Sequence, residues 1–145
     1  MPRKLPSRAA LAALTAAVAL VAGASPALGA SHAALWHTRG DQVNCGIEIH
    51  VPGTRASEVL CSAEGIPTPK QGFGDGGFVQ LAATGGPRTL RLSQDSFAGS
   101  RSALLGRGAL WSALGVTCHV GPATVMCFNA DNHGFVIGNG RYRTF

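Results

Sequence analysis

Apolar residues alternate with polar ones in several short stretches of the chain. In 42–51 the odd positions hold valine, cysteine or isoleucine, and in 116–120 the even positions hold valine or cysteine. A period of two is typical of a β-strand that buries one face. Shorter apolar segments predict further strands at 59–61, 78–83, 89–93, 125–127 and 135–137. No long apolar pattern of helical period follows residue 30, so the sequence predicts an all-β protein.

Turn-forming residues separate these predicted strands. Gly121-Pro122-Ala123-Thr124 stands between two of them, and Asn139-Gly140 is a pair typical of tight hairpin turns. Asp131-Asn132-His133-Gly134 predicts another corner. Short strands with a turn signal at intervals of about ten residues are typical of a small sandwich or barrel. The expected architecture is therefore an antiparallel sandwich or barrel of short strands.

The four cysteines predict two disulfides, and their spacing alone permits three pairings. A turn at 121–124 places Cys118 directly opposite Cys127, at a separation that suits a disulfide. The pairing of Cys45 with Cys61 then follows by elimination. Crossed pairings would require the sulfurs of both hairpins to meet across the core. Zinc is the competing interpretation of four cysteines, but none of them lies in a Cys-x-x-Cys pair, and the sequence predicts no metal site.

Two parts of the chain share a pattern of tryptophan, valine and cysteine. Leu35-Trp36 precedes Val-x-Cys-x-Ile at 43–47 and Val-x-Cys at 59–61. Leu110-Trp111 precedes Val-x-Cys-x-Val at 116–120, and Val-x-Cys follows at 125–127. The gaps between the segments differ, so chance is an alternative explanation. If the repeat is real, it predicts two similar disulfide-linked hairpins packed around one core.

The first thirty residues read as a secretory signal peptide. Basic residues at 3, 4 and 8 precede an apolar run at 9–24, and small residues at 26–30 supply a cleavage site near Gly29 or Ala30. Removal of this segment leaves one predicted domain, 31–145, in an extracellular setting that favours disulfides. The apolar run is short for a bilayer span, so we expect no stable membrane insertion after processing.

Processing changes the charge of the protein. The whole chain has 12 basic and 7 acidic residues, a net charge of +5. Three basic residues and no acidic ones lie in 1–30, which leaves a mature charge of only +2. The high isoelectric point is thus poor evidence for nucleic-acid binding, and we expect no nucleic-acid partner.

The sequence contains no recognised catalytic or cofactor motif. The histidines at 32, 37, 50, 119 and 133 form neither a His-Glu-x-x-His nor a His-x-x-x-His pattern, and no Gly-x-Ser-x-Gly is present. The cysteines are expected to be oxidised and unable to act as nucleophiles. His133 follows Asp131 closely enough to be tuned as a base, but a structural corner explains the pair as well. His119 is expected to be partly packed. We therefore expect no catalytic residues and no cofactor.

The C-terminal third resembles a family. Gly115-Val116-Thr117-Cys118, then Cys-Phe-Asn at 127–129, His-Gly-Phe at 133–135 and the terminal Arg-Tyr-Arg-Thr-Phe resemble an uncharacterised family of small secreted actinobacterial proteins. Asn132 stands where that family has the first glycine of a Gly-His-Gly-Phe turn. Residues 90–96 are also similar to the family. The resemblance implies export and paired cysteines but, as a domain of unknown function, no catalytic residues.

Together these patterns favour an exported, non-catalytic domain that binds an extracellular or cell-envelope partner. Two alternatives are a secreted peptidase inhibitor and a histidine-based hydrolase. The best candidate for an inhibitory loop is the glycine-rich segment 66–77. The sequence identifies no ligand-binding residues.

Overall fold

The computed structural model describes residues 34–47, 58–93 and 102–145. The predicted signal peptide and residues 48–51 of the strand predicted over 42–51 lie outside these ranges. The elements are β1 (Leu35–His37), η1 (Arg39–Asp41), β2 (Val43–Ile47), β3 (Glu58–Ala63), β4 (Gly76–Ala82), β5 (Arg88–Leu92), β6 (Ala103–Leu104), β7 (Leu110–Ala113), β8 (Val116–Val120), β9 (Val125–Asn129), β10 (Gly134–Gly138) and β11 (Arg141–Thr144).

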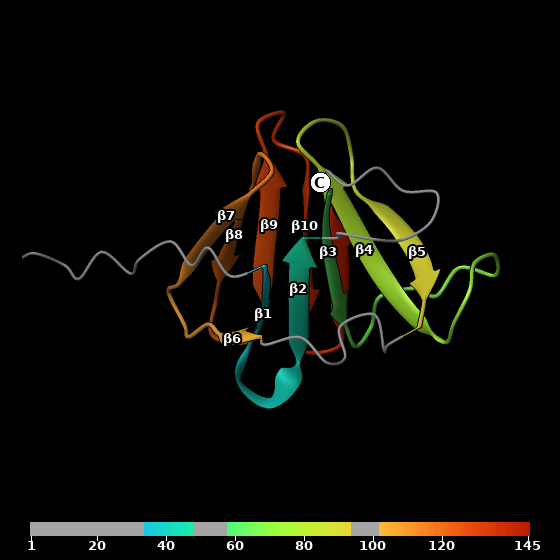
Figure 1. Ribbon diagram of the computed structural model, residues 1–145, viewed down its shortest axis with the longest axis horizontal. Coiled ribbons are helices and arrows are strands. Elements are labelled where there is room, and N and C mark those ends of the chain that lie inside the picture. Colours follow the sequence, from blue (N-terminus) through green and yellow to red (C-terminus); the bar gives the residue numbers. More distant parts are fainter. Residues whose placement is uncertain (1–33, 48–57, 94–101) are drawn as a thin grey trace, which may run out of the picture.

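The strands form two sheets that face each other (Figure 1). One sheet has the strand order β5-β4-β3-β2-β1-β6, and the other has the order β11-β10-β9-β8-β7. The expected all-β fold is confirmed, and of the two architectures that were considered it is the sandwich. All pairs are antiparallel except β1 with β6, which is parallel. The described part of the chain has no helix with the length and hydropathy that crossing a membrane would require.

Matching rows of inward-facing residues run across the two sheets. In the first sheet the row is Trp36, Cys45, Cys61 and Val79, each directly opposite the next. In the second sheet the row is Trp111, Cys118, Cys127 and Phe135. All eight side chains are buried. The repeat seen in the sequence is therefore present in the fold, and it extends beyond two hairpins to a five-stranded meander in each sheet.

The two rows meet in the core of the sandwich. The rings of Trp36 and Trp111 lie 5.7 Å apart between centroids, at a tilt of 55°. Tilted aromatic pairs at this distance add stabilisation beyond the apolar area that they bury. Both disulfides form as expected, Cys45–Cys61 with 4.1 Å between Cα atoms and Cys118–Cys127 with 4.0 Å. Each disulfide joins neighbouring strands of a single sheet.

Tight turns set the register of the hairpins. Asn139 and Gly140 both have positive φ, 52° and 66°, as a two-residue hairpin turn requires. Leu114 and Gly115 adopt the same conformation between β7 and β8, at φ 52° and 76°. The left-handed region is costly for leucine, and that position carried no turn signal in the sequence. The 121–124 turn is closed by a hydrogen bond from Gly121 N to Thr124 O, 2.7 Å long.

Candidate functional site

A cleft of about 410 Å³ is lined by residues from η1, β6 and the β8–β9 turn. Figure 1 shows η1 and β6 at the same end of the sandwich. The walls of the cleft come from three segments that are far apart in the sequence. The described lining residues are Thr38, Arg39, Gln42, Val43, Leu104, Leu105, Gly106, Arg107, Val120, Gly121, Pro122, Ala123, Thr124 and Val125. A concave site of this size is in the usual range for small-molecule pockets.

The first wall is the turn around η1, which Thr38 closes. The backbone N–H of Thr38 donates to Val43 O at 2.9 Å, and the backbone N–H of Val43 donates to the Thr38 hydroxyl at 3.1 Å. Gly40, at φ 75°, supplies the left-handed residue that the turn needs. The paired hydrogen bonds hold the turn at a fixed place beside the start of β2, so Arg39 projects from an anchored loop.

The second wall is the segment from Leu104 to Ala109, which passes from one sheet to the other. Leu105 N donates to His37 O of β1 at 2.9 Å. A few residues later Gly108 N donates to Val120 O of β8 at 2.8 Å, and Val120 N donates to Ala109 O at 3.0 Å. The segment is therefore hydrogen-bonded to both sheets, and it holds Arg107 across the open end of the sandwich.

The third wall is the turn between β8 and β9, which is packed from behind by the β10–β11 turn. A Cβ atom added at Gly138 would come within 2.6 Å of Ala123 O, so the two turns approach each other through backbone atoms. This close approach requires glycine, and Gly138 also has a φ of 115°. The position of the β8–β9 turn therefore depends on its contact with β10 as well as on its own two strands.

The lining of the cleft combines exposed apolar residues, Leu104, Pro122 and Ala123, with two arginines. Val43, Val120 and Val125 are buried, whereas Leu104 is 61% exposed. Arg39 and Arg107 are exposed, and no described residue of the lining is acidic. Within the described residues neither guanidinium forms an ion pair, in contrast to Arg88, which lies 3.0 Å from Glu58. The cleft therefore presents two cations beside an apolar surface.

His133 and Asp131, the pair considered as a possible base, lie at a structural corner. The Asp131 carboxylate accepts a hydrogen bond from Gly85 N at 3.0 Å, and His133 donates its backbone N–H to Asn129 Oδ1 at 3.1 Å. Neither Asp131 nor His133 is among the residues that line the cleft. Asn129, which the sequence reading did not single out, organises this corner.

Asn129 is buried and joins two parts of the fold. Its Nδ2 donates to Ala82 O and Gly85 O, at 3.0 and 2.8 Å, so it holds the end of the β4–β5 hairpin. Its Oδ1 accepts from the backbone N–H groups of Asp131 and His133, at 3.1 Å each. A signal for this role was present in the sequence, because Asn129 directly precedes a turn, but its partners lie in a distant hairpin.

The other histidines that the structure describes, His37 and His119, are not among the residues that line the cleft. His119 lies opposite Met126, as expected. It is exposed and not partly packed, because it lies on the solvent-facing side of β8. His37 Nδ1 is hydrogen-bonded to Ser102 Oγ, which brings together a base and a hydroxyl. A serine nucleophile also needs a substrate site and donors for the developing oxyanion. Neither residue of this pair is among those that line the cleft.

The glycine-rich loop presents an exposed aromatic ring. Phe73 is 85% exposed, and the loop is fixed by a hydrogen bond from Arg91 Nε to Gly74 O, 2.6 Å long. Gly72 and Gly74 have φ values of 124° and 108°. These conformations are outside the extended region, in which strand-like peptides bind along another protein. The two glycines beside Phe73 therefore lie outside the backbone conformation of an extended, strand-like segment.

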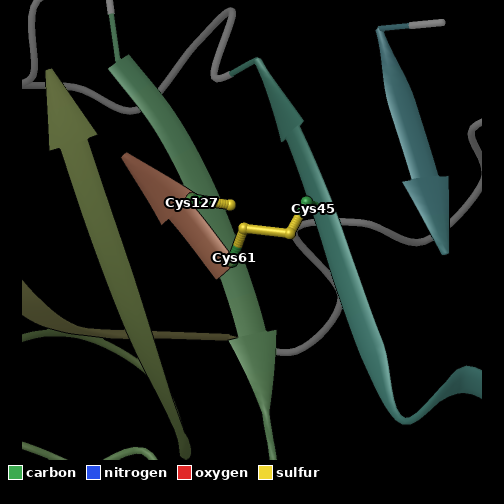
Figure 2. A group of neighbouring side chains, drawn as sticks. All are labelled: Cys45, Cys61 and Cys127. Carbon is green, nitrogen blue, oxygen red and sulfur yellow. A yellow bond between two sulfur atoms is a disulfide. The ribbon is translucent and has the colours of Figure 1, made fainter. Parts of the chain in front are cut away.

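Three sulfur atoms gather in the core. The Sγ atoms of Cys45, Cys61 and Cys127 all lie within 4.8 Å of one another, and Figure 2 shows Cys127 reaching from β9 toward the bridge between β2 and β3. All four cysteines are in disulfides, so this group offers no thiolate to a metal ion.

Comparison with known proteins gives no relative: no protein-family model, no curated protein and no solved structure matches this chain. The resemblance to a family of secreted actinobacterial proteins thus stays a prediction. The function must be argued from the geometry.

Proposed function

We propose that this protein is an exported, non-catalytic domain that binds an extracellular or cell-envelope partner, and that the cleft at the open end of the sandwich is its binding site. The observation that carries the proposal is the construction of the cleft. Three anchored segments, one from each sheet and one that joins them, surround a volume of about 410 Å³ with both apolar and polar residues exposed in its lining. Binding sites are typically concave, largely apolar and preformed in this way.

A non-catalytic role is supported by where the polar residues lie. Among the described residues, the cleft lining includes no histidine, no carboxylate and no cysteine. Its polar side chains are arginine, threonine and glutamine, which bind ligands well but are poorly suited to proton transfer near neutral pH. A histidine-based hydrolase would need its base beside the bound substrate.

The peptidase-inhibitor alternative rests on the loop that contains Phe73. An exposed ring on an anchored loop can serve as a contact for another protein. The positive φ values on both sides of Phe73 do not favour a substrate-like conformation. Incubation of the pure protein with serine proteases tests this alternative directly, because an inhibitor slows the protease at a fixed stoichiometry.

Export is part of the proposal. The disulfide-linked core is consistent with an oxidising compartment. If 1–30 is a signal peptide, the intact mass of secreted protein corresponds to a chain that starts at Ala30 or Ser31. Full-length protein retained in the membrane fraction would exclude this processing.

The binding role is tested with two exposed leucines. Leu104, at the cleft, is 61% exposed, and Leu110, on the outer face of the second sheet, is 49% exposed. Immobilised mature protein is incubated with envelope fractions and the captured material is compared among the wild type, Leu104→Ser and Leu110→Ser. We expect Leu104→Ser to reduce capture and Leu110→Ser to leave it unchanged. Equal capture by all three proteins would exclude the cleft as the binding site.

A further inference from the structure

We propose that the cleft selects ligands in which an anionic group, a phosphate or a carboxylate, is attached to an apolar body. This inference rests on the proposed function and adds the chemical class of the ligand. It starts from the two arginines, since they are the charged groups in the described lining.

Arg39 and Arg107 reach the cleft from different walls. Arg39 belongs to the η1 turn, which is hydrogen-bonded to the start of β2, and Arg107 belongs to the segment that is hydrogen-bonded to both sheets. Two like charges held around one concavity repel each other unless an anion lies between them. Among the residues whose side chains the structure describes, no carboxylate belongs to the lining. A bound anion would therefore lower the electrostatic energy of the cleft.

The geometry of arginine narrows the class of anion. The planar guanidinium has donors in a fixed fork that matches the oxygens of carboxylates and phosphates, and it is less strongly hydrated than an ammonium group. The apolar surface beside it lowers the local dielectric and strengthens the attraction. Thr38 and Thr124 add hydroxyl groups to the lining, which can donate to oxygens that the arginines do not reach.

The exposed apolar surface of the cleft favours a ligand that is larger than a small hydrated ion. The lining exposes apolar surface at Leu104, which is 61% exposed, and at Pro122 and Ala123, whereas its three valines are buried. A ligand that covers this surface with hydrocarbon gains from the removal of apolar area from water, whereas inorganic phosphate gains nothing there. The two surfaces together fit an amphipathic anion, with its head at the arginines and its body along Leu104, Pro122 and Ala123.

Four simple probes separate these contributions: octyl phosphate, octanoate, octyl glucoside and inorganic phosphate, each below its micelle concentration. Calorimetric titration of the mature protein is expected to give tighter binding for octyl phosphate and octanoate than for the neutral glucoside or the bare phosphate. Raising the salt concentration should weaken the anionic probes and leave the glucoside unchanged. Equal affinity for octyl glucoside and octyl phosphate would overturn the inference.

Charge-neutral variants locate the anion. Arg39→Gln and Arg107→Gln are each expected to weaken octyl phosphate by roughly tenfold, the effect of losing one charge-assisted hydrogen bond. Arg143→Gln, an exposed position farther along β11 that is not among the lining residues, is the matched control and should change nothing. Unchanged affinity in both cleft variants would also overturn the inference.

The outcomes distinguish the inference from the proposed function. If Leu104→Ser loses envelope capture but no anionic probe binds, the cleft is a binding site for some other chemistry and the inference fails alone. If Leu104→Ser keeps full capture, the cleft is not the binding site for the partner, and both the proposed function and the inference that rests on it fail.

Discussion

The sulfur atoms of Cys61 and Cys127 lie within 4.8 Å of each other although they belong to different disulfides on facing sheets (Figure 2). Disulfides between the two hairpins would require their sulfur atoms to meet across the core, and the sequence therefore favours pairing within each hairpin. The sandwich does bring these sulfurs nearly together. The native pairing is therefore selected by strand register, which places each cysteine directly opposite its partner, and not by separation of the two bridges.

This proximity predicts disulfide exchange in a variant that lacks Cys45. In Cys45→Ser the Cys61 thiolate can attack Cys127 Sγ. A Cys61–Cys127 bond then forms, the Cys118–Cys127 bond breaks, and Cys118 leaves as the thiolate. Non-reducing tryptic mapping at mildly alkaline pH should show the peptide 56–70 joined to the peptide 108–141.

The matched control is Cys127→Ser, which leaves Cys118 as the free thiol. The sulfur of Cys118 is not in the group of three that lie within 4.8 Å of one another. We expect this variant to keep the Cys45–Cys61 bridge without exchange. Peptides 56–70 and 108–141 that remain separate in Cys45→Ser would contradict the prediction.

Asn129 and His133 differ in what their side chains contribute to the same corner. Asn129→Ala removes hydrogen bonds to four backbone groups, two of them in the β4–β5 hairpin, and should lower the free energy of unfolding by about 2–3 kcal/mol. His133 contributes its backbone N–H, so His133→Ala should cost less than about 0.5 kcal/mol and abolish no binding. Denaturant titrations measure both, and similar losses in the two variants would refute the assignment of this role to Asn129.

Tyr142 is the one tyrosine of the chain, which makes its titration directly visible. Partial burial against the core removes water from the phenol and raises the pKa of Tyr142 above its ordinary value near 10. The phenol thus contributes stability that is complete below pH 10 and is lost as the pH rises through the raised pKa.

Absorbance of the phenolate near 295 nm should give a higher midpoint in the folded protein than in guanidinium chloride. Tyr142→Phe should reduce the fall in unfolding free energy over this alkaline range. Coincident midpoints in folded and unfolded protein would show that Tyr142 is not desolvated by the fold.

Gly138 tests the contact between the two turns behind the cleft. Gly138→Ala places a methyl group within 2.6 Å of Ala123 O at a φ of 115°, and we expect a loss of about 1–3 kcal/mol in unfolding free energy. Gly86→Ala is the control, because a Cβ there meets nothing within 4 Å. Thermal unfolding should separate the two variants, with Gly86→Ala close to the wild type. A Gly138→Ala protein of normal stability would mean that the turns can move apart.

The sequence by itself determined the features that depend on neighbours in the chain. Alternation over 116–120 identified a half-buried strand, and the turn at 121–124 set the register that places Cys118 opposite Cys127. The same local rules gave the β2–β3, β4–β5 and β9–β10 hairpins and the all-β class, but they did not predict β7 or β11 as strands. They could not give β1 and β6, which are short and pair in parallel across a long stretch of sequence.

The tertiary structure decided the features that depend on which faces meet. Three contacts join segments that are distant in the chain: the tilted ring contact of Trp36 with Trp111, the approach of Cys61 to Cys127, and the hydrogen bond from Asn129 to Gly85. The cleft has the same origin, since its walls come from η1, the 104–109 segment and the β8–β9 turn. A period of two reveals which side of a strand is apolar, but it carries no information about the partner that covers that side, because burial rewards any apolar surface that fits.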